Sequence, residues 1–150
     1  KIAPDTVAAV SAGSVTTPAH YFELAHALEH ARANDRAAFD NLATAYARAA
    51  HLADASVGCE VDEALLGDAE RVLLETIDAA EASVASALSA QDFPGVISAL
   101  AALREPIDAF FDEVMVMDED ERLRTNRLAL LNRFAAVFSG IADLGAMARK

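Results

Sequence analysis

Tryptophan is absent from this sequence of 150 residues, and cysteine, glycine and proline are scarce. Cys59 is the only cysteine, which excludes an internal disulfide bond and favours a reducing, cytoplasmic setting. No apolar run approaches the roughly 20 residues that span a bilayer, and no signal-peptide pattern opens the chain, so we expect no contact with a membrane. The first residue is Lys1 rather than Met, which indicates a piece of a longer polypeptide.

Basic residues are half as frequent as acidic ones, 12 against 24, and the net charge is −12. A general nucleic-acid binder is normally basic, so this balance argues against one and excludes DNA as an expected partner. The charge is unevenly spread, because residues 61–121 carry 2 basic and 16 acidic side chains while residues 122–150 carry 6 and 1. Phosphate contacts dominate RNA affinity. Any RNA contact should therefore be concentrated in the last helix.

Motifs that carry chemistry are also missing. The sequence has no Gly-rich phosphate loop, no recognisable Ser-His-Asp set and no Cys/His cluster, so no constellation supports catalysis. His26, His30 and Glu23 fall in one predicted helix, but their order does not match the zinc-protease motif and a solvated face is the stronger interpretation. We expect no catalytic residue, no metal and no cofactor in this segment.

Alanine and helical periodicity are what the sequence has in abundance. Hydrophobic residues make up 54% of the chain, and alanine has the best helix propensity. With no strand-like alternation, the sequence predicts an all-α antiparallel bundle of about five to seven helices. Helices are expected over about 18–34, 35–54, 62–90, 92–105 and 106–116, followed by a last helix after residue 118. Residues 1–17 are interpreted as a tail or linker from a preceding domain, with a short helix over 1–12 as the alternative, and 18–150 as the helical domain.

Residues 104–133 join the last two predicted helices through a short acidic turn, and they hold the densest set of arginines. Pro106 suits the first position of a helix, where its missing N–H costs nothing, and it should force Glu105 out of helical geometry. Asp118 can act as the N-cap of the last helix, with Glu121 three residues later completing a capping box.

The polar residues of the last helix can be placed by angle around its apolar face, which is centred on Phe134. At about 100° per residue, Asn126, Arg133 and Arg122 fall about 80–120° to one side and form an outward row suited to RNA. Arg124 lies on the other flank. Arg127 falls within the apolar face, where an ion pair with Asp112 or Asp108 is a stronger interpretation than RNA recognition.

Two neighbouring phenylalanines precede the acidic turn. Helical spacing makes both Phe110 and Phe111 core residues by default. Only an exposed edge could stack on a base, and Phe111 is our candidate for that role.

The same stretch carries a resemblance to a known family. The matching segments are residues 102–112, 114–116, 119–124 and 126–131, with weaker similarity upstream at 40–50 and 61–66. They resemble the C-terminal end of the β subunit of bacterial heterotetrameric glycyl-tRNA synthetase, over roughly residues 35–147. That region of the family is a helical anticodon-binding domain, related to one named for an Asp-Ala-Leu-Arg signature. This chain has Glu121-Arg122-Leu123-Arg124 there, so only the Leu-Arg half is kept.

The resemblance implies that this domain binds the anticodon arm of tRNA-Gly, with Arg122, Asn126, Arg133, Arg124 and Arg127 as candidate contacts. It also implies the rest of the β subunit and the α subunit of an α2β2 heterotetramer as partners, with ATP and Mg²⁺ bound on the α subunit. Two alternatives stay open: the corresponding domain of an arginyl- or cysteinyl-type synthetase, and a helical protein-interaction module without RNA binding.

Overall fold

The computed structural model describes residues 2–13 and 17–148, and within these ranges it contains helices and no strands. In chain order the elements are α1 (Pro4–Ser11), α2 (Pro18–Asn34), α3 (Arg36–Leu52), the 3-10 turn η1 (Glu63–Leu65), α4 (Asp68–Ser89), α5 (Phe93–Ala101), α6 (Arg104–Glu113), α7 (Glu121–Ser139) and the 3-10 turn η2 (Leu144–Met147). The prediction of an all-α bundle of five to seven helices is confirmed.

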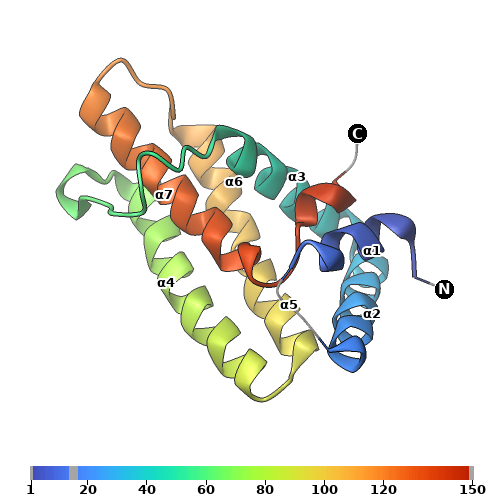
Figure 1. Ribbon diagram of the computed structural model, residues 1–150. Coiled ribbons are helices and arrows are strands. Elements are labelled where there is room, and N and C mark those ends of the chain that lie inside the picture. The colour runs from blue at the N-terminus through green and yellow to red at the C-terminus, as the bar shows by residue number, and fades with distance from the viewer. Residues whose placement is uncertain (1, 14–16, 149–150) are drawn as a thin grey trace.

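The long helix α7 runs through the middle of the bundle, packed against α3 and α4 (Figure 1). Helices α5 and α6 follow one another end to end and run antiparallel to α4, while α1 and α2 lie at the opposite side of the molecule from α4 (Figure 1). The loop that joins α6 to α7 and the segment between α3 and α4 therefore lie near the same end of the bundle (Figure 1).

Aromatic side chains of α7 and its neighbours fill the core. Phe110, Phe134 and Phe138 are fully buried. The ring of Phe138 lies 4.9 Å from that of Tyr46 and 5.1 Å from that of Phe134, centroid to centroid. Each such ring removes a large apolar area from water, which is the main force that stabilises the bundle.

Helix α1 is fastened to the bundle by both apolar and polar contacts. Ala9 and Val10 are buried, and the N–H of Asp143, just before η2, donates to the carbonyl of Ala9 at 2.9 Å. Asp5 of α1 forms an ion pair with Arg32 of α2, with 2.7 Å between Nη1 and Oδ2. The short helix expected within residues 1–12 is thus present. The assignment of residues 1–17 to a preceding domain stays a prediction.

Three helix boundaries differ from the sequence-based expectation. Helix α6 begins at Arg104, so Pro106 is its third residue and Glu105 is helical. The prediction of a break at Glu105 is wrong, because proline is tolerated throughout the first turn, where N–H groups have no intrahelical acceptor. The chain turns instead at Ala102–Leu103, where buried Leu103 anchors the junction.

The other two differences concern capping carboxylates. Asp120, not Asp118, caps α7, and its Oδ1 accepts from the N–H of Arg122 at 2.9 Å. Asp118 instead accepts from the N–H of Asp120 at 2.8 Å. Asp62 caps only the short turn η1, so α4 begins later than expected, after Gly67. A run of several carboxylates supplies several caps of similar strength, and tertiary contacts decide which one is used.

Candidate nucleic-acid interface

The α6–α7 loop and the first turn of α7 form the candidate interface. Met115 and Met117 of this loop are 71% and 59% exposed. The side chain of Arg122 is 78% exposed, and its closest carboxylate oxygen, on Asp120, is 3.9 Å away. Arg124 is half-buried and donates from Nη1 to the carbonyl of Asp118 at 3.2 Å. Two arginines and two flexible apolar side chains thus share this end of the bundle.

Arg127 holds the loop in place from beneath. Its side chain is only 14% exposed, and its Nε donates to Oε1 of Glu70 on α4 at 3.2 Å. Its Nη1 donates to the carbonyl of Met115 at 2.6 Å and to Oδ2 of Asp118 at 3.2 Å. The prediction of an ion pair for Arg127 is confirmed, but the predicted partners Asp112 and Asp108 are wrong. The N–H of Asp120, followed by Arg127, keeps the pKa of Asp118 below its usual value.

Asn126 performs a structural task that the angular analysis did not foresee. It is 5% exposed, so the prediction that it points outward is wrong. Its Oδ1 accepts from the N–H of Asp62 at 2.6 Å, and its Nδ2 donates to the carbonyl of the same residue at 3.0 Å. The segment between α3 and α4 covers this side of α7, and a helical angle taken alone contains no information about such a cover.

Asn132 repeats the arrangement further along α7. Its Oδ1 accepts from the N–H of Asp54, and its Nδ2 donates to the carbonyls of Asp54 and Gly58 at 2.8 and 2.7 Å. The two asparagines together fasten the α3–α4 segment to α7. Sequence reasoning missed Asn132. The one signal in the sequence is that asparagine is disfavoured inside a helix, so its presence there hints at a tertiary partner. This signal is weak, because it does not identify the partner.

Arg133 is engaged with the acidic surface of α4. Its Nη2 lies 2.5 Å from Oδ1 of Asp78 and 3.3 Å from Oε1 of Glu81. The expected row of Arg122, Asn126 and Arg133 therefore does not form an open surface, because α4 and the preceding segment engage the last two residues. Of the row, Arg122 alone is largely exposed. Contact of these residues with tRNA stays a prediction.

The two phenylalanines of α6 have different environments. Phe110 is fully buried, as predicted, and its ring centroid lies 5.5 Å from that of Phe111. Phe111 is half-buried. The guanidinium carbon of Arg48, on α3, lies 4.1 Å from the centroid of the Phe111 ring. One face of the candidate stacking ring is thus covered by an arginine.

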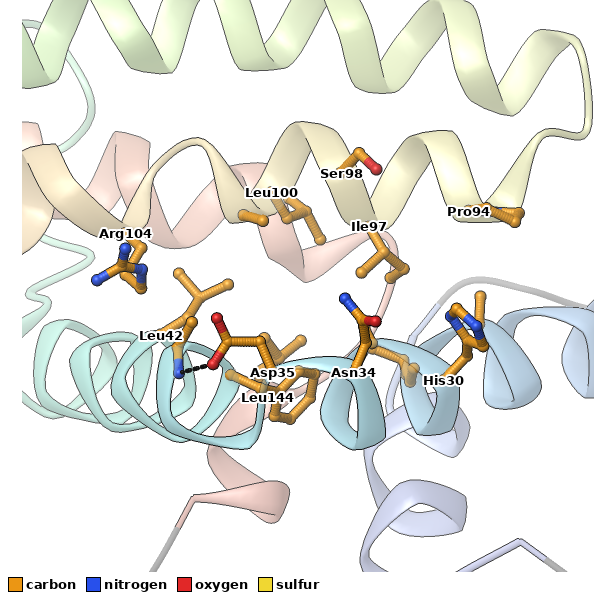
Figure 2. A pocket seen from close by; sticks show the side chains of 16 residues that line it. His30, Asn34, Asp35, Leu42, Pro94, Ile97, Ser98, Leu100, Arg104 and Leu144 are labelled. Carbon is orange, nitrogen blue, oxygen red and sulfur yellow. Dashed lines mark hydrogen bonds between the residues drawn. The ribbon is translucent and has the colours of Figure 1, made fainter.

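A cavity of about 550 Å³ lies elsewhere, between the α2–α3 corner and α5. Figure 2 shows His30, Asn34 and Asp35 on the corner, facing Ile97 and Leu100 of α5. Asp35 caps α3 by accepting from the N–H of Ala38 at 3.0 Å. No residue of the α6–α7 loop or of α7 lines this cavity, so it is separate from the candidate interface.

The described residues contain neither a metal-ligand cluster nor a membrane-spanning helix. They contain no group of three or more His, Cys, Asp or Glu side chains suited to a metal ion. No helix over residues 2–13 and 17–148 is both long and apolar enough to cross a membrane.

Comparison with known families identifies the domain type. Residues 42–145 match the family model of the DALR anticodon binding domain. The chain belongs to this family. The matched range of the DALR domain includes Arg48 on α3, all of α6 and α7, and the loop between them.

Individual relatives of this DALR domain carry a more specific name. The chain is 40% identical over 144 residues to proteins named glycine–tRNA ligase beta subunit from Aliivibrio fischeri (strain MJ11) and Vibrio vulnificus (strain YJ016). The matches cover 93% of this chain but only 21% and 20% of those proteins. The chain therefore spans about a fifth of the length of the curated relatives it matches.

Proposed function

We propose that this DALR domain binds the anticodon arm of tRNA-Gly as part of a glycine–tRNA ligase β subunit. The observation that carries the proposal is the 40% identity, over 93% of the chain, to proteins with that name. The identity is supported by the match of residues 42–145 to an anticodon-binding family. In this proposal residues 18–150 form the anticodon-binding domain, and residues 1–17 lead into it from the rest of the subunit.

Arg122 and Arg124 are the residues that we propose contact the RNA directly. Both lie in the first turn of α7, which follows the loop that carries the exposed Met115 and Met117. Arginine suits an RNA loop because its guanidinium can donate to phosphates and base edges and can stack on an unpaired base. The flexible methionine side chains can adapt to splayed bases.

Asn126, Arg127 and Arg133 support this site in our proposal rather than reading bases. Each is bound to protein groups: Asn126 to the backbone of Asp62, Arg127 to Glu70 and the α6–α7 loop, and Arg133 to α4. An RNA contact would have to displace those partners, and stranding Glu70 in particular would leave a buried charge unpaired.

The acidic body of the domain adds selectivity to the proposed site. Residues 61–121 carry a net charge of −14, so this part of the domain repels phosphates. Productive binding is then confined to the arginine-bearing end of α7, and the affinity of the isolated domain should be modest.

The wider role follows from the same relatives. We propose that the whole enzyme is an aminoacyl-tRNA synthetase that works in the cytoplasm, with α and β subunits in an α2β2 assembly. Glycine activation with ATP and Mg²⁺ would take place on the α subunit. This domain would contribute tRNA selection without a catalytic group or cofactor of its own.

The proposal is tested by binding of this chain to an isolated tRNA-Gly anticodon stem-loop at two salt concentrations. A stem-loop with altered anticodon bases is compared in parallel. We expect salt-dependent binding that weakens when the anticodon is altered, because loop bases are read together with phosphates. Equal binding to both stem-loops, or binding to neither, would contradict anticodon reading by this domain.

Two variants locate the contact. Arg122→Ala and Arg124→Ala should each weaken binding, and each lost phosphate contact should reduce the slope of log affinity against log salt by about 0.7. Arg36→Ala is the matched control, because Arg36 is exposed at the start of α3 and lies 3.7 Å from Asp40 rather than beside α7's first turn. A loss as large in the control as in the other two would refute the assignment.

A further inference from the structure

The stack of Arg48 on Phe111 is a feature that the proposed contacts do not use. Arg48 is exposed near the C-terminal end of α3, and its guanidinium carbon lies 4.1 Å from the centroid of the Phe111 ring on α6. Such a separation is typical of a cation–π contact, in which the guanidinium lies over the ring face. One side of the guanidinium is thus supported by an aromatic ring whose own core neighbour is Phe110.

Arg48 differs from the other arginines that the structure describes. Six of them lie within 4.0 Å of a carboxylate oxygen: Arg32, Arg36, Arg104, Arg122, Arg127 and Arg133. Two more donate to a backbone carbonyl: Arg71 and Arg124. Among residues 2–13 and 17–148, Arg48 has only its ring contact. In a chain with twice as many acidic as basic residues, a guanidinium that lies over an aromatic ring and has no carboxylate partner among the described residues is available to a ligand.

We propose that the outer side of Arg48 stacks on an unpaired base of the RNA loop, with Phe111 as the support beneath the guanidinium. This inference rests on the proposed function, and it names a base-binding position at that interface. Guanidinium planes are weakly hydrated and stack on exposed bases of single-stranded RNA. Phe111 then acts as a positioning residue, instead of stacking on the base itself as the sequence suggested.

The surrounding charge favours a base over a phosphate at this position. Asp112 and Glu113 follow Phe111 directly and are both exposed. Exposed carboxylates that directly follow Phe111 on α6 repel a phosphate, whereas a neutral base carries no charge to be repelled. Stacking depends on the planar faces, so the contact tolerates different bases and adds affinity without reading sequence. The proposed ligand is therefore the face of an unpaired nucleobase.

A double-mutant cycle, with one change in the protein and one in the RNA, tests this position. Stem-loops that each lack one loop base, as an abasic nucleotide, are titrated with the unaltered chain and with Arg48→Ala. We expect Arg48→Ala to weaken binding of the intact loop by roughly 5- to 150-fold, the range for one stacked base. For one abasic position the same variant should cause almost no further loss. The salt dependence of binding should stay unchanged, because no phosphate contact is removed.

Three further variants separate stacking from charge and from folding. Arg48→Lys keeps the charge but loses the plane, so it should bind as weakly as Arg48→Ala. Phe111→Leu keeps an apolar side chain against the core but removes the support, so it should share the loss. Arg36→Ala is the control, because Arg36 is exposed on the same helix and lies 3.7 Å from Asp40. It should bind like the unaltered chain.

The outcomes are distinct. Failure of the unaltered chain to bind any stem-loop would refute both the proposed function and this inference. If the unaltered chain binds and Arg48→Ala binds with the same affinity, the stacking position alone is refuted. The same holds if Arg48→Lys binds as tightly as the unaltered chain. Equal loss at every abasic position, with no coupling to Arg48, would also refute it.

Discussion

Arg127 joins three parts of the bundle that are far apart in the sequence. Its guanidinium contacts Glu70 on α4, the carbonyl of Met115 and the carboxylate of Asp118. The Glu70 side chain is only 4% exposed. Its Oε2 is buried and has no hydrogen-bond partner among the described residues. The carboxylate of Glu70 therefore depends on a single donor, which makes Arg127 the residue whose loss is most costly at this site.

We expect Arg127→Met to lower the free energy of unfolding by about 3 kcal/mol, because it strands the buried carboxylate of Glu70. Replacing both partners in Arg127→Met/Glu70→Leu should recover part of that loss, since no buried charge remains. Urea denaturation followed by circular dichroism measures both variants. A double variant no more stable than the single one would show that the Met115 and Asp118 contacts, rather than the pair with Glu70, make up the effect.

The two halves of this pair differ in how far sequence could predict them. The position of Arg127 within an apolar helix face predicted an ion pair, and this was correct. The partner could not be predicted, because Glu70 is 57 residues away and reaches Arg127 only through the packing of α4 on α7. Asn126 shows the same limit, since its helical angle was available but the segment that covers it was not.

At the scale of elements, apolar periodicity predicted the long helices well. Helices α2 and α3 end close to where their stripes and capping residues placed them. Boundaries were less predictable where several signals compete, as in the acidic turn before α7, because local chemistry permits more than one N-cap. The packing of α1 was also beyond prediction, since a stretch of eight residues has too little periodicity to identify its contacts.

The attachment of α1 to α2 should depend on pH. Arg32 lowers the pKa of Asp5. Burial alone would raise the pKa of Glu29, but hydrogen bonds from the Thr6 hydroxyl and the Ala3 N–H, together with Arg32, outweigh burial and lower it. Because both carboxyl groups bind protons less readily in the folded chain than in the unfolded one, they stabilise the fold above a pH of about 4 to 5. That contribution is lost as the pH falls through the lowered values.

Thermal denaturation from pH 7 down to pH 3 measures this contribution. Compared with the unaltered chain, Asp5→Asn/Glu29→Gln should melt at a lower temperature at pH 7, because Arg32 loses both charged partners. Its melting temperature should then change less below pH 5, where the unaltered chain loses its advantage. Parallel curves for the two proteins across the whole range would contradict a role for these carboxylates in acid sensitivity.

At the scale of the whole molecule, the sequence contained more information about family than about surface. The Leu-Arg half-signature and the flanking segments predicted the DALR domain correctly. The surface that stays open was not predictable from those segments, because burial of Asn126 and pairing of Arg133 depend on residues 52 to 64 positions upstream. Arg48 and Phe111 likewise meet only because α3 packs beside α6.

The charge of the molecule should make salt act in opposite directions on folding and on RNA binding. A net charge of −12 destabilises the compact state by self-repulsion, and added salt screens that repulsion within about 10 Å at 0.1 M. We therefore expect the melting temperature to rise as the NaCl concentration increases from about 20 to about 300 mM, the span over which screening grows most. RNA affinity should fall over the same span, because counterion release drives phosphate contacts.

A charge variant separates the two effects of salt. Glu75 and Glu119 are exposed, and Glu75→Gln/Glu119→Gln reduces the self-repulsion without touching an arginine. This variant should melt higher than the unaltered chain at low salt and gain less from added salt. Its RNA affinity should rise at low salt, because fewer carboxylates oppose the phosphates. A melting temperature that falls with salt in the unaltered chain would mean that attractive pairs such as Arg133–Asp78, rather than the excess of acid, dominate its electrostatics.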